Sequence, residues 1–376
     1  MIPRHPYGKT GAIVSRLGLG AMRLPVVGAD NSVTFEESTR IIRRALQLGV
    51  NFFDSHLNYL DGQSEPALGA ALAGVARSSY VIQTKNPDYR EETQGDTYRD
   101  RLLLALEHLG CGHIDFYLMH SLTWERFAKT GKRFLKVADE AKREGLIRHV
   151  GFSCHDTVPN MLRLIETGAF ECMLVQYNYI DSGNAEALAA AHERGMGTSA
   201  MGPLGGGRFV APSSFLTGAP RDESAVKSAF RFVLSNENLD CAMSGMMSVR
   251  EVEENARIAS KASPLSGEER RRIERDAHDR RKLAELYCTG CGYCAPCPHE
   301  VSISEVFNLR NHHEVFGLHE YARGHYAKLL AQGHAAPSCQ ECGACEEKCP
   351  QHISIREELV RCHRLLSDEP FKRKPK

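Results

Sequence analysis

The chain has 376 residues, and Lys+Arg and Asp+Glu both total 47, so its formal net charge is zero. This balance argues against a nucleic-acid partner, and the hydrophobic and charged fractions of 42% and 25% are those of an ordinary globular protein. The opening MIPRHPYGKTG has no apolar signal segment and no run is long enough to span a membrane, so we expect a cytoplasmic protein.

Short apolar runs alternate with amphipathic segments from residue 12 to residue 263. The predicted strands are 17–22, 51–55, 80–84, 114–120, 147–153, 172–178, 196–201 and 240–246. Helical periodicity between them is clear in 36–49, 97–110 and 134–145. Eight such units predict an α/β fold, a (β/α)8 TIM barrel. A doubly wound sheet is the alternative, but no Gly-x-Gly-x-x-Gly opens the first unit.

Polar side chains follow three successive predicted strands. Asp54 and Tyr59 follow the second strand, Lys85 follows the third and His120 ends the fourth. In a barrel these strand ends meet at the mouth, where active sites lie. An ammonium lowers the pKa of a nearby phenol, so we expect Tyr59 to protonate a carbonyl oxygen while His120 donates a hydrogen bond to it. The alternative to this catalytic role is that these polar residues only cap the strand ends.

The same four residues resemble the Asp, Tyr, Lys and His tetrad of the aldo-keto reductases. The spacing in DSHLNY matches the family, and YGKTGAIVSRLGLGAMRL resembles its N-terminal hairpin, which closes the barrel floor. The resemblance covers residues 1–265 and implies a nicotinamide dinucleotide bound across the barrel mouth. It implies contacts to the carboxamide, the pyrophosphate and the adenosine end from Ser153, Gln176, Leu204, Gly205, Gly206, Ser248, Glu254 and Asn255.

The chain departs from the family pattern in its expected coenzyme site. Met201 stands where an aromatic ring usually stacks on the nicotinamide, and Cys154 follows the carboxamide serine in place of Asn or Gln. Gly245 and Glu251 stand where basic residues often grip a 2′-phosphate, and only Arg250 is near them in sequence. Both NAD and NADP therefore stay open as the coenzyme.

Eight of the thirteen cysteines lie in two related segments, CTGCGYCAPCPHEVSISE (288–305) and CQECGACEEKCPQHISIRE (339–357). Each contains C-x2-C-x2-C and a fourth Cys before Pro, the pattern of [4Fe–4S] ligands, whereas zinc sites usually take two C-x2-C pairs. In two-cluster ferredoxins the fourth ligand comes from the other motif. This predicts one cluster on Cys288, Cys291, Cys294 and Cys349 and another on Cys339, Cys342, Cys345 and Cys297. The stretch between the motifs is predicted to be helical, and the whole resembles the iron–sulfur-bearing branch of the family.

We therefore expect a barrel over 1–265, a linker helix over 266–286, a helix-rich ferredoxin-like domain over 287–365 and a basic tail over 366–376. The leading hypothesis is a cytoplasmic oxidoreductase that interconverts a small carbonyl substrate and its alcohol with NAD(P)H. The alternative is an electron-transfer or redox-sensing protein whose barrel binds a nucleotide or a partner. A hydride carries two electrons and a [4Fe–4S] cluster takes one, which favours clusters outside the hydride step and leaves room for a redox partner protein. We also expect Trp124, as a loop aromatic, to line the substrate pocket.

Overall fold

The computed structural model describes residues 1–27, 32–86, 97–179, 181–205, 224–282, 288, 294–314, 316–349 and 352–373. The described residues form two compact units. The first, the barrel unit, contains Met1–Gly206 and Val226–Leu265. The second, the C-terminal unit, contains Ser266–Lys376.

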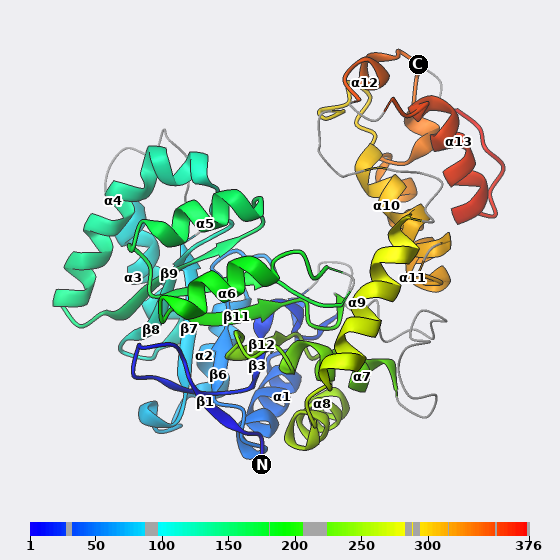
Figure 1. The fold of residues 1–376 in the computed structure, drawn as a ribbon. Helices are drawn as coiled ribbons and strands as arrows, with labels where there is room; N and C mark the ends of the chain where they lie inside the picture. The colour runs from blue at the N-terminus through cyan, green and yellow to red at the C-terminus, as the bar shows by residue number, and fades with distance from the viewer. Residues whose placement is uncertain are drawn as a thin grey trace. The chain divides into compact units, whose positions relative to one another are not determined.

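Eight parallel strands of the barrel unit close on one another in the order β10-β11-β12-β3-β6-β7-β8-β9 (Figure 1). In chain order they are β3 (Leu17–Gly20), β6 (Phe52–Asp54), β7 (Val81–Asn86), β8 (Ile114–Met119), β9 (Ile147–Cys154), β10 (Cys172–Gln176), β11 (Gly197–Met201) and β12 (Cys241–Ser244). Each lies within or overlaps one of the eight predicted strands. The predicted (β/α)8 fold is therefore confirmed.

Helices follow the strands around the outside of the barrel (Figure 1). They are α1 (Phe35–Gln47), α2 (Ser64–Leu72), α3 (Thr97–Leu109), α4 (Trp124–Arg143), α5 (Val158–Glu166), α6 (Ala185–Glu193), α7 (Ala225–Leu234) and α8 (Val249–Lys261). Shorter elements are η1 (Ala21–Arg23), η2 (Arg77–Ser79) and the paired β4 (Val26–Val27) and β5 (Ser32–Val33).

The start of α4 corrects two expectations. The sequence predicts a helix over 134–145, but α4 already begins at Trp124, because the Oγ1 of Thr123 accepts a hydrogen bond from the N–H of Arg126 at 3.2 Å and caps the first turn. Trp124 is therefore a helical residue and not a loop aromatic. Its ring lies 4.0 Å from the guanidinium carbon of Arg163.

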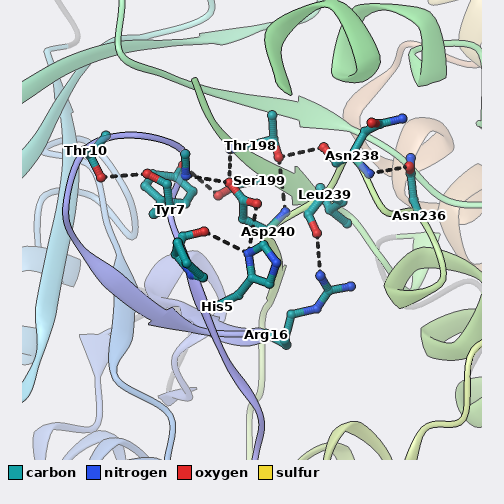
Figure 2. A network of polar contacts seen from close by, with 12 residues as sticks. His5, Tyr7, Thr10, Arg16, Thr198, Ser199, Asn236, Asn238, Leu239 and Asp240 are labelled. Carbon is teal, nitrogen blue, oxygen red and sulfur yellow. Dashed lines mark hydrogen bonds and ion pairs between the residues drawn. The ribbon is translucent and has the colours of Figure 1, made fainter. Parts of the chain in front are cut away.

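A hairpin closes the floor of the barrel, as predicted, with β1 (Arg4–Pro6) antiparallel to β2 (Ile13–Ser15). Tyr7 is fully buried beneath the strands, and its ring meets Phe52 and Phe116 edge-on at centroid distances of 5.2 and 4.8 Å. Its hydroxyl hydrogen-bonds to the Oγ of Ser199 at 2.8 Å (Figure 2). The next residue, Gly8, has a φ of +54°, and a Cβ there would come within 2.4 Å of the backbone nitrogen of Gly197, so only glycine fits.

Asp240, just before β12, holds this hairpin in place (Figure 2). Its buried carboxylate accepts hydrogen bonds from the backbone N–H groups of Gly8 and Thr198, each at 3.0 Å. The Nδ1 of His5 lies 3.2 Å from the other carboxylate oxygen. The guanidinium of Arg16 donates to the carbonyl of Leu239 at 2.7 Å. These contacts, which we call the floor latch, join the first residues of the barrel unit to its last strand.

The C-terminal unit is helical where the structure describes it. Its elements are α9 (Gly267–Lys282), α10 (Ile303–Glu314), α11 (His319–Gln332), η5 (Ala336–Ser338), α12 (Ala344–Glu347) and α13 (Ile355–Leu366). The helical prediction for the stretch between the cysteine motifs is confirmed. Its core is built from buried residues of α10, α11 and α13, including Val306, Phe307, Tyr326, Leu329 and Leu359. The part of the chain described here contains no helix long and apolar enough to cross a membrane.

Candidate active site and cluster site

A buried ion pair lies at the mouth of the barrel, between β6 and β7. Asp54 ends β6, and the Nζ of Lys85 on β7 lies 2.7 Å from both of its carboxylate oxygens. Nζ also donates to the carbonyl of Ser55 at 2.6 Å. Lys85 is 1% exposed and Asp54 is 4% exposed. Burial alone lowers the pKa of Lys85, but Asp54 and Tyr59 outweigh burial and raise the pKa above its ordinary value, so the ammonium is retained at neutral pH.

Tyr59 stands beside this pair on the segment that follows β6. Its ring centroid lies 4.9 Å from the Nζ of Lys85, and the side chain is half-buried. Burial raises the pKa of Tyr59, Lys85 lowers it, and the net effect is a raised pKa. The expected lowering by Lys85 is thus present but smaller than the effect of burial. At neutral pH Tyr59 is a protonated phenol with a proton available to donate.

His120 follows β8 and completes the group of four predicted residues. Its ring centroid lies 6.2 Å from that of Tyr59, at an interplanar angle of 81°. Burial, and after it Lys85, His155 and Arg126, lower the pKa of His120 to about 4. His120 is therefore a neutral imidazole at neutral pH, able to donate one hydrogen bond without carrying charge.

His56 belongs to the same group, although the sequence motifs do not predict a role for it. It lies two residues beyond Asp54, is 2% exposed, and its ring centroid is only 4.0 Å from that of His120. Burial, and after it His120 and Lys85, lower the pKa of His56 to about 2. The only signal for it in the sequence is its place after the strand end in DSHLNY, a segment of which the tetrad uses only the first and last residues.

The expected carboxamide contacts lie on neighbouring strand ends. Ser153 on β9 pairs in register with Leu174 on β10, two residues before Gln176. The Oγ of Ser153 accepts a hydrogen bond from the N–H of Ser121 at 2.8 Å. Gln176 is half-buried and pairs in register with Met201 on β11. Both side chains therefore end their strands at the mouth that holds the tetrad.

The expected phosphate and adenosine contacts follow β11 and β12. Leu204 is half-buried, Gly205 has a φ of +59°, and Gly206 lies outside the described residues. At α8, the Oγ of Ser248 accepts a hydrogen bond from the N–H of Glu251 at 3.2 Å, so Ser248 caps that helix. Glu254 is exposed, whereas Asn255 is buried at 4% exposure.

One basic residue reaches this region from a distant part of the sequence. Arg23 in η1 is exposed, and its side chain lies against Gly245, where a Cβ would come within 2.9 Å of the Cδ of Arg23. In the sequence, only Arg250 is a cation near this segment. The contact between η1 and the residue after β12 depends on the closure of the barrel, so sequence distance hides it.

In the C-terminal unit four cysteines line one pocket: Cys297 of the first motif and Cys339, Cys342 and Cys345 of the second. This is the set that the ligand exchange between motifs predicts for one cluster. Burial raises the pKa of Cys345 to about 11 and also raises the pKa of Cys339. Of the other predicted set, Cys288, Cys294 and Cys349 pack partly buried against the core of this unit, and Cys291 lies outside the described residues.

The donors of this pocket suit an iron–sulfur cluster. Its four thiols are the ligand type that [4Fe–4S] clusters take. The pocket also has apolar walls, from Val301, Ile303 and Leu359. Four thiols around such a space fit a [4Fe–4S] cluster.

Comparison with known proteins agrees with the geometry. The model of the aldo/keto reductase family matches residues 16–215, more than half of the chain. The chain belongs to the aldo/keto reductase family. A model described as a 4Fe-4S dicluster domain matches residues 287–354. The chain is thus an NAD(P)-dependent oxidoreductase of this family that carries a 4Fe-4S domain.

Individual relatives match part of the chain. The L-galactose dehydrogenase of Arabidopsis thaliana is 26% identical over 289 residues, covering 70% of this chain and 90% of the plant protein. The NADH-specific methylglyoxal reductase of Escherichia coli K12 is 24% identical, covering 53% of this chain and 66% of that reductase. Among solved structures, the holo form of an aldo-keto reductase from Bacillus halodurans has a TM-score of 0.64 at 23% identity, covering 73% of this chain and 96% of its own, and shows the shared fold.

Proposed function

We propose that this protein interconverts a small carbonyl compound and the corresponding alcohol, with Tyr59 as the proton donor. The observation that carries the proposal is the position of Tyr59, with its phenol beside the buried Lys85–Asp54 pair and its ring beside the neutral His120. A phenol next to a fixed ammonium can donate its proton and leave a stabilised phenolate. Methylglyoxal, the substrate in the name of the E. coli relative, is a reasonable first compound to test.

Each residue has one role in the proposed reduction. The bound coenzyme supplies the hydride. As negative charge develops on the carbonyl oxygen, Tyr59 donates its proton there, and the ammonium of Lys85 stabilises the phenolate that remains. Asp54 holds that ammonium in place with two 2.7 Å contacts. His120 donates a hydrogen bond to the same oxygen and orients the carbonyl for attack.

The coenzyme contacts are part of this proposal. Ser153 and Gln176 would hydrogen-bond the carboxamide, and Leu204, Gly205 and Gly206 would cover the pyrophosphate. The adenosine end would lie along Ser248, Glu254 and Asn255. The exposed guanidinium of Arg23, whose side chain lies against Gly245, adds a positive charge that suits a phosphate. NAD and NADP both remain compatible with these residues.

We further propose two [4Fe–4S] clusters with exchanged fourth ligands, in the ferredoxin-like domain over 287–365. The barrel would end at 265, with the linker helix over 266–286 and the tail over 366–376. Reduced thiols and clusters of this kind suit a cytoplasmic protein. The clusters stand outside the hydride step, because they take electrons singly.

A second function rests on one observation about the cluster pocket. Cys342 is exposed, whereas Cys297, Cys339 and Cys345 are partly buried. A cluster with a ligand at the surface can exchange electrons with a partner, since transfer requires close approach. This favours electron transfer to or from a redox partner protein as the alternative to a purely structural role of the clusters.

The test compares anaerobically purified wild type with Tyr59→Phe. Oxidation of NADH and of NADPH is followed with methylglyoxal and with 4-nitrobenzaldehyde as probe substrates. We expect carbonyl-dependent oxidation in the wild type and its loss in Tyr59→Phe, with nucleotide binding retained in both. Equal turnover in the two proteins would contradict the role of Tyr59. Turnover in either protein only when a viologen or ferredoxin is added would favour the electron-transfer function.

A further inference from the structure

His56 occupies the space between the two proton-bearing side chains of the site. Its ring centroid lies 4.0 Å from that of His120, at 39°, and 4.9 Å from that of Tyr59, at 50°. The residue is 2% exposed, so its ring is enclosed by protein. No step of the proposed reduction uses His56, although it touches both residues that contact the reacting oxygen.

The backbone fixes the orientation of His56. Its Nδ1 accepts a hydrogen bond from the N–H of Asn58 at 3.1 Å. In a neutral imidazole the proton must then be on Nε2. That Nε2 is buried and has no hydrogen-bond partner among the described residues. An unpaired buried donor costs free energy, and such costs are tolerated mainly where function needs the side chain.

The ring of His120, in contrast, makes no hydrogen bond to the residues that the structure describes. Its Nδ1 is buried and has no partner in the part of the chain that the structure describes. The ring contacts in place are the close, tilted contact with His56 and the edge contact with Tyr59. The plane of His120 therefore depends on these neighbouring rings, and His56 is by far the nearer.

We propose that His56 is a positioning residue, whose ring holds the imidazole of His120 at the angle from which it donates a hydrogen bond to the substrate oxygen. This inference rests on the proposed function and adds to it a residue outside the tetrad. The N–H of Asn58 orients the ring of His56, and that ring in turn contacts the ring of His120.

Burial and the surrounding charges keep both rings neutral near neutral pH. Burial, and after it His120 and Lys85, lower the pKa of His56 to about 2. Burial, and after it Lys85, His155 and Arg126, lower the pKa of His120 to about 4. Neither ring gains a charge near neutral pH, so mutual repulsion does not separate the two rings.

Three variants separate the ring of His56 from its hydrogen bond. His56→Phe keeps a ring against His120 but has no acceptor for the N–H of Asn58. His56→Asn keeps an acceptor for that N–H, since Asn bonds its own backbone two residues on, but removes the ring. His56→Ala removes both. We expect kcat to fall about 10- to 100-fold in His56→Asn and His56→Ala, as expected for a displaced hydrogen-bond donor, and much less in His56→Phe. KM for the coenzyme should hardly change.

A second measurement does not depend on turnover. Proteins labelled with 13C in histidine are titrated by NMR, and the His120 signal is assigned by its loss in His120→Gln. In His56→Ala and His56→Asn, water reaches His120, so its pKa should rise from about 4 toward the ordinary value of about 6.5. In His56→Phe the burial persists and the pKa should stay low. If His56 had a purely structural role, replacing it would lower stability without raising the pKa of His120.

The control is His192→Phe on α6, which removes an imidazole whose Nδ1 is likewise buried without a partner among the described residues. It should leave kcat and the pKa of His120 unchanged. Wild-type kcat and an unshifted His120 pKa in His56→Ala would overturn the inference, as would equal losses in His56→Phe and His56→Ala. If the wild type reduced no carbonyl while the pKa of His120 rose as expected, the proposed function would fail and the contact would stand.

Discussion

Burial and Lys85 act on the phenol of Tyr59 in opposite directions, and burial has the larger effect. The raised pKa keeps the proton on Tyr59 in the free enzyme. The ammonium beside it, buried and held by Asp54, acts mainly once the proton has left, because it then faces a phenolate. At the scale of single residues, this balance suits the proposed proton donation in the direction of reduction.

Replacing Tyr59 by Phe should lower kcat by about 10²- to 10⁴-fold, the usual contribution of one well-placed acid. The ring and its contact with His56 remain, so binding of the coenzyme should persist. Single-turnover kinetics and titration of nucleotide binding check the two halves of this prediction. Loss of nucleotide binding together with turnover would indicate a structural role for the phenol.

Replacing Lys85 by Met leaves the carboxylate of Asp54 buried without its cation. Removing one partner of a buried pair usually costs about 3–5 kcal/mol of unfolding free energy. The double variant Asp54→Asn, Lys85→Met should recover part of this stability but none of the activity. Trp124 is the single tryptophan of the chain and lies in the barrel unit, so its fluorescence during urea unfolding reports on this unit. Recovery of activity in the double variant would contradict the role of Lys85.

That Asp54, Tyr59, Lys85 and His120 come together could be predicted from sequence, because each lies at or just after the end of a recognisable apolar strand. His56 and Arg23 could not. The ring contact between His56 and His120 joins segments after two non-adjacent strands, and the contact of Arg23 with Gly245 appears only when the barrel closes. Contacts of this kind depend on three-dimensional packing and leave no periodic pattern in the chain.

At the scale of elements, Glu171, which lies just before β10, bonds to residues of α4 and β9. Its carboxylate contacts the Nζ of Lys142 at 2.5 Å and the Nδ1 of His149 at 2.7 Å, and it accepts the N–H of Val150 at 3.0 Å. Burial raises the pKa of Glu171, but these hydrogen bonds outweigh burial and lower the pKa to about 2. The carboxylate is therefore stabilising only when it is ionised.

Glu171→Gln should lower the unfolding free energy at pH 7 by about 1 kcal/mol, a figure kept small because the side chain is partly exposed. Because the pKa of Glu171 is lower in the folded state, ionised Glu171 stabilises the fold at pH values above its unfolded pKa of about 4.5. This stabilisation is lost as the pH falls toward 2. The difference in unfolding free energy between variant and wild type should therefore be largest at pH 7 and shrink below pH 4.5. Urea unfolding followed by Trp124 fluorescence measures it. A difference independent of pH would show that Glu171 acts through packing alone.

The element boundaries show where pattern reasoning fails. All eight barrel strands follow from their apolar runs, because a strand buried on both faces is continuous in hydrophobicity. The first turns of α4 were missed, since WERFAKTGK carries few apolar residues in helical spacing and its start is decided by the cap from Thr123. A single hydrogen bond at a helix end is a weaker sequence signal than a repeated pattern.

At the scale of the whole molecule, the cluster ligands should follow the exchange between motifs. We expect about eight iron and eight sulfide per chain after anaerobic purification, as two four-iron clusters require. Cys297→Ser should remove the cluster of the second motif and lower the iron content by about half. Cys362→Ser, a buried cysteine of the same unit outside both motifs, is the control and should keep full iron.

Electron paramagnetic resonance of the reduced protein distinguishes the outcomes. The wild type should show two interacting spins, and Cys297→Ser a single isolated one. If the iron content of Cys297→Ser equalled that of Cys362→Ser and of the wild type, the predicted ligand exchange would be wrong. A stoichiometric zinc content without the broad visible absorption of iron–sulfur clusters would contradict the cluster proposal as a whole.

The floor latch has a consequence for the synthesis of the chain. Gly8 bonds to Asp240, 232 residues later in the sequence. A ribosome adding about 5–20 residues per second needs about 10–50 s to deliver that carboxylate after the hairpin has emerged. During this interval the N–H of Gly8 lacks its acceptor, although Phe52 and Phe116, which pack on the ring of Tyr7, have already been made. The hairpin is thus made long before the residue that latches it, which makes it a natural segment for chaperone contact on the nascent chain.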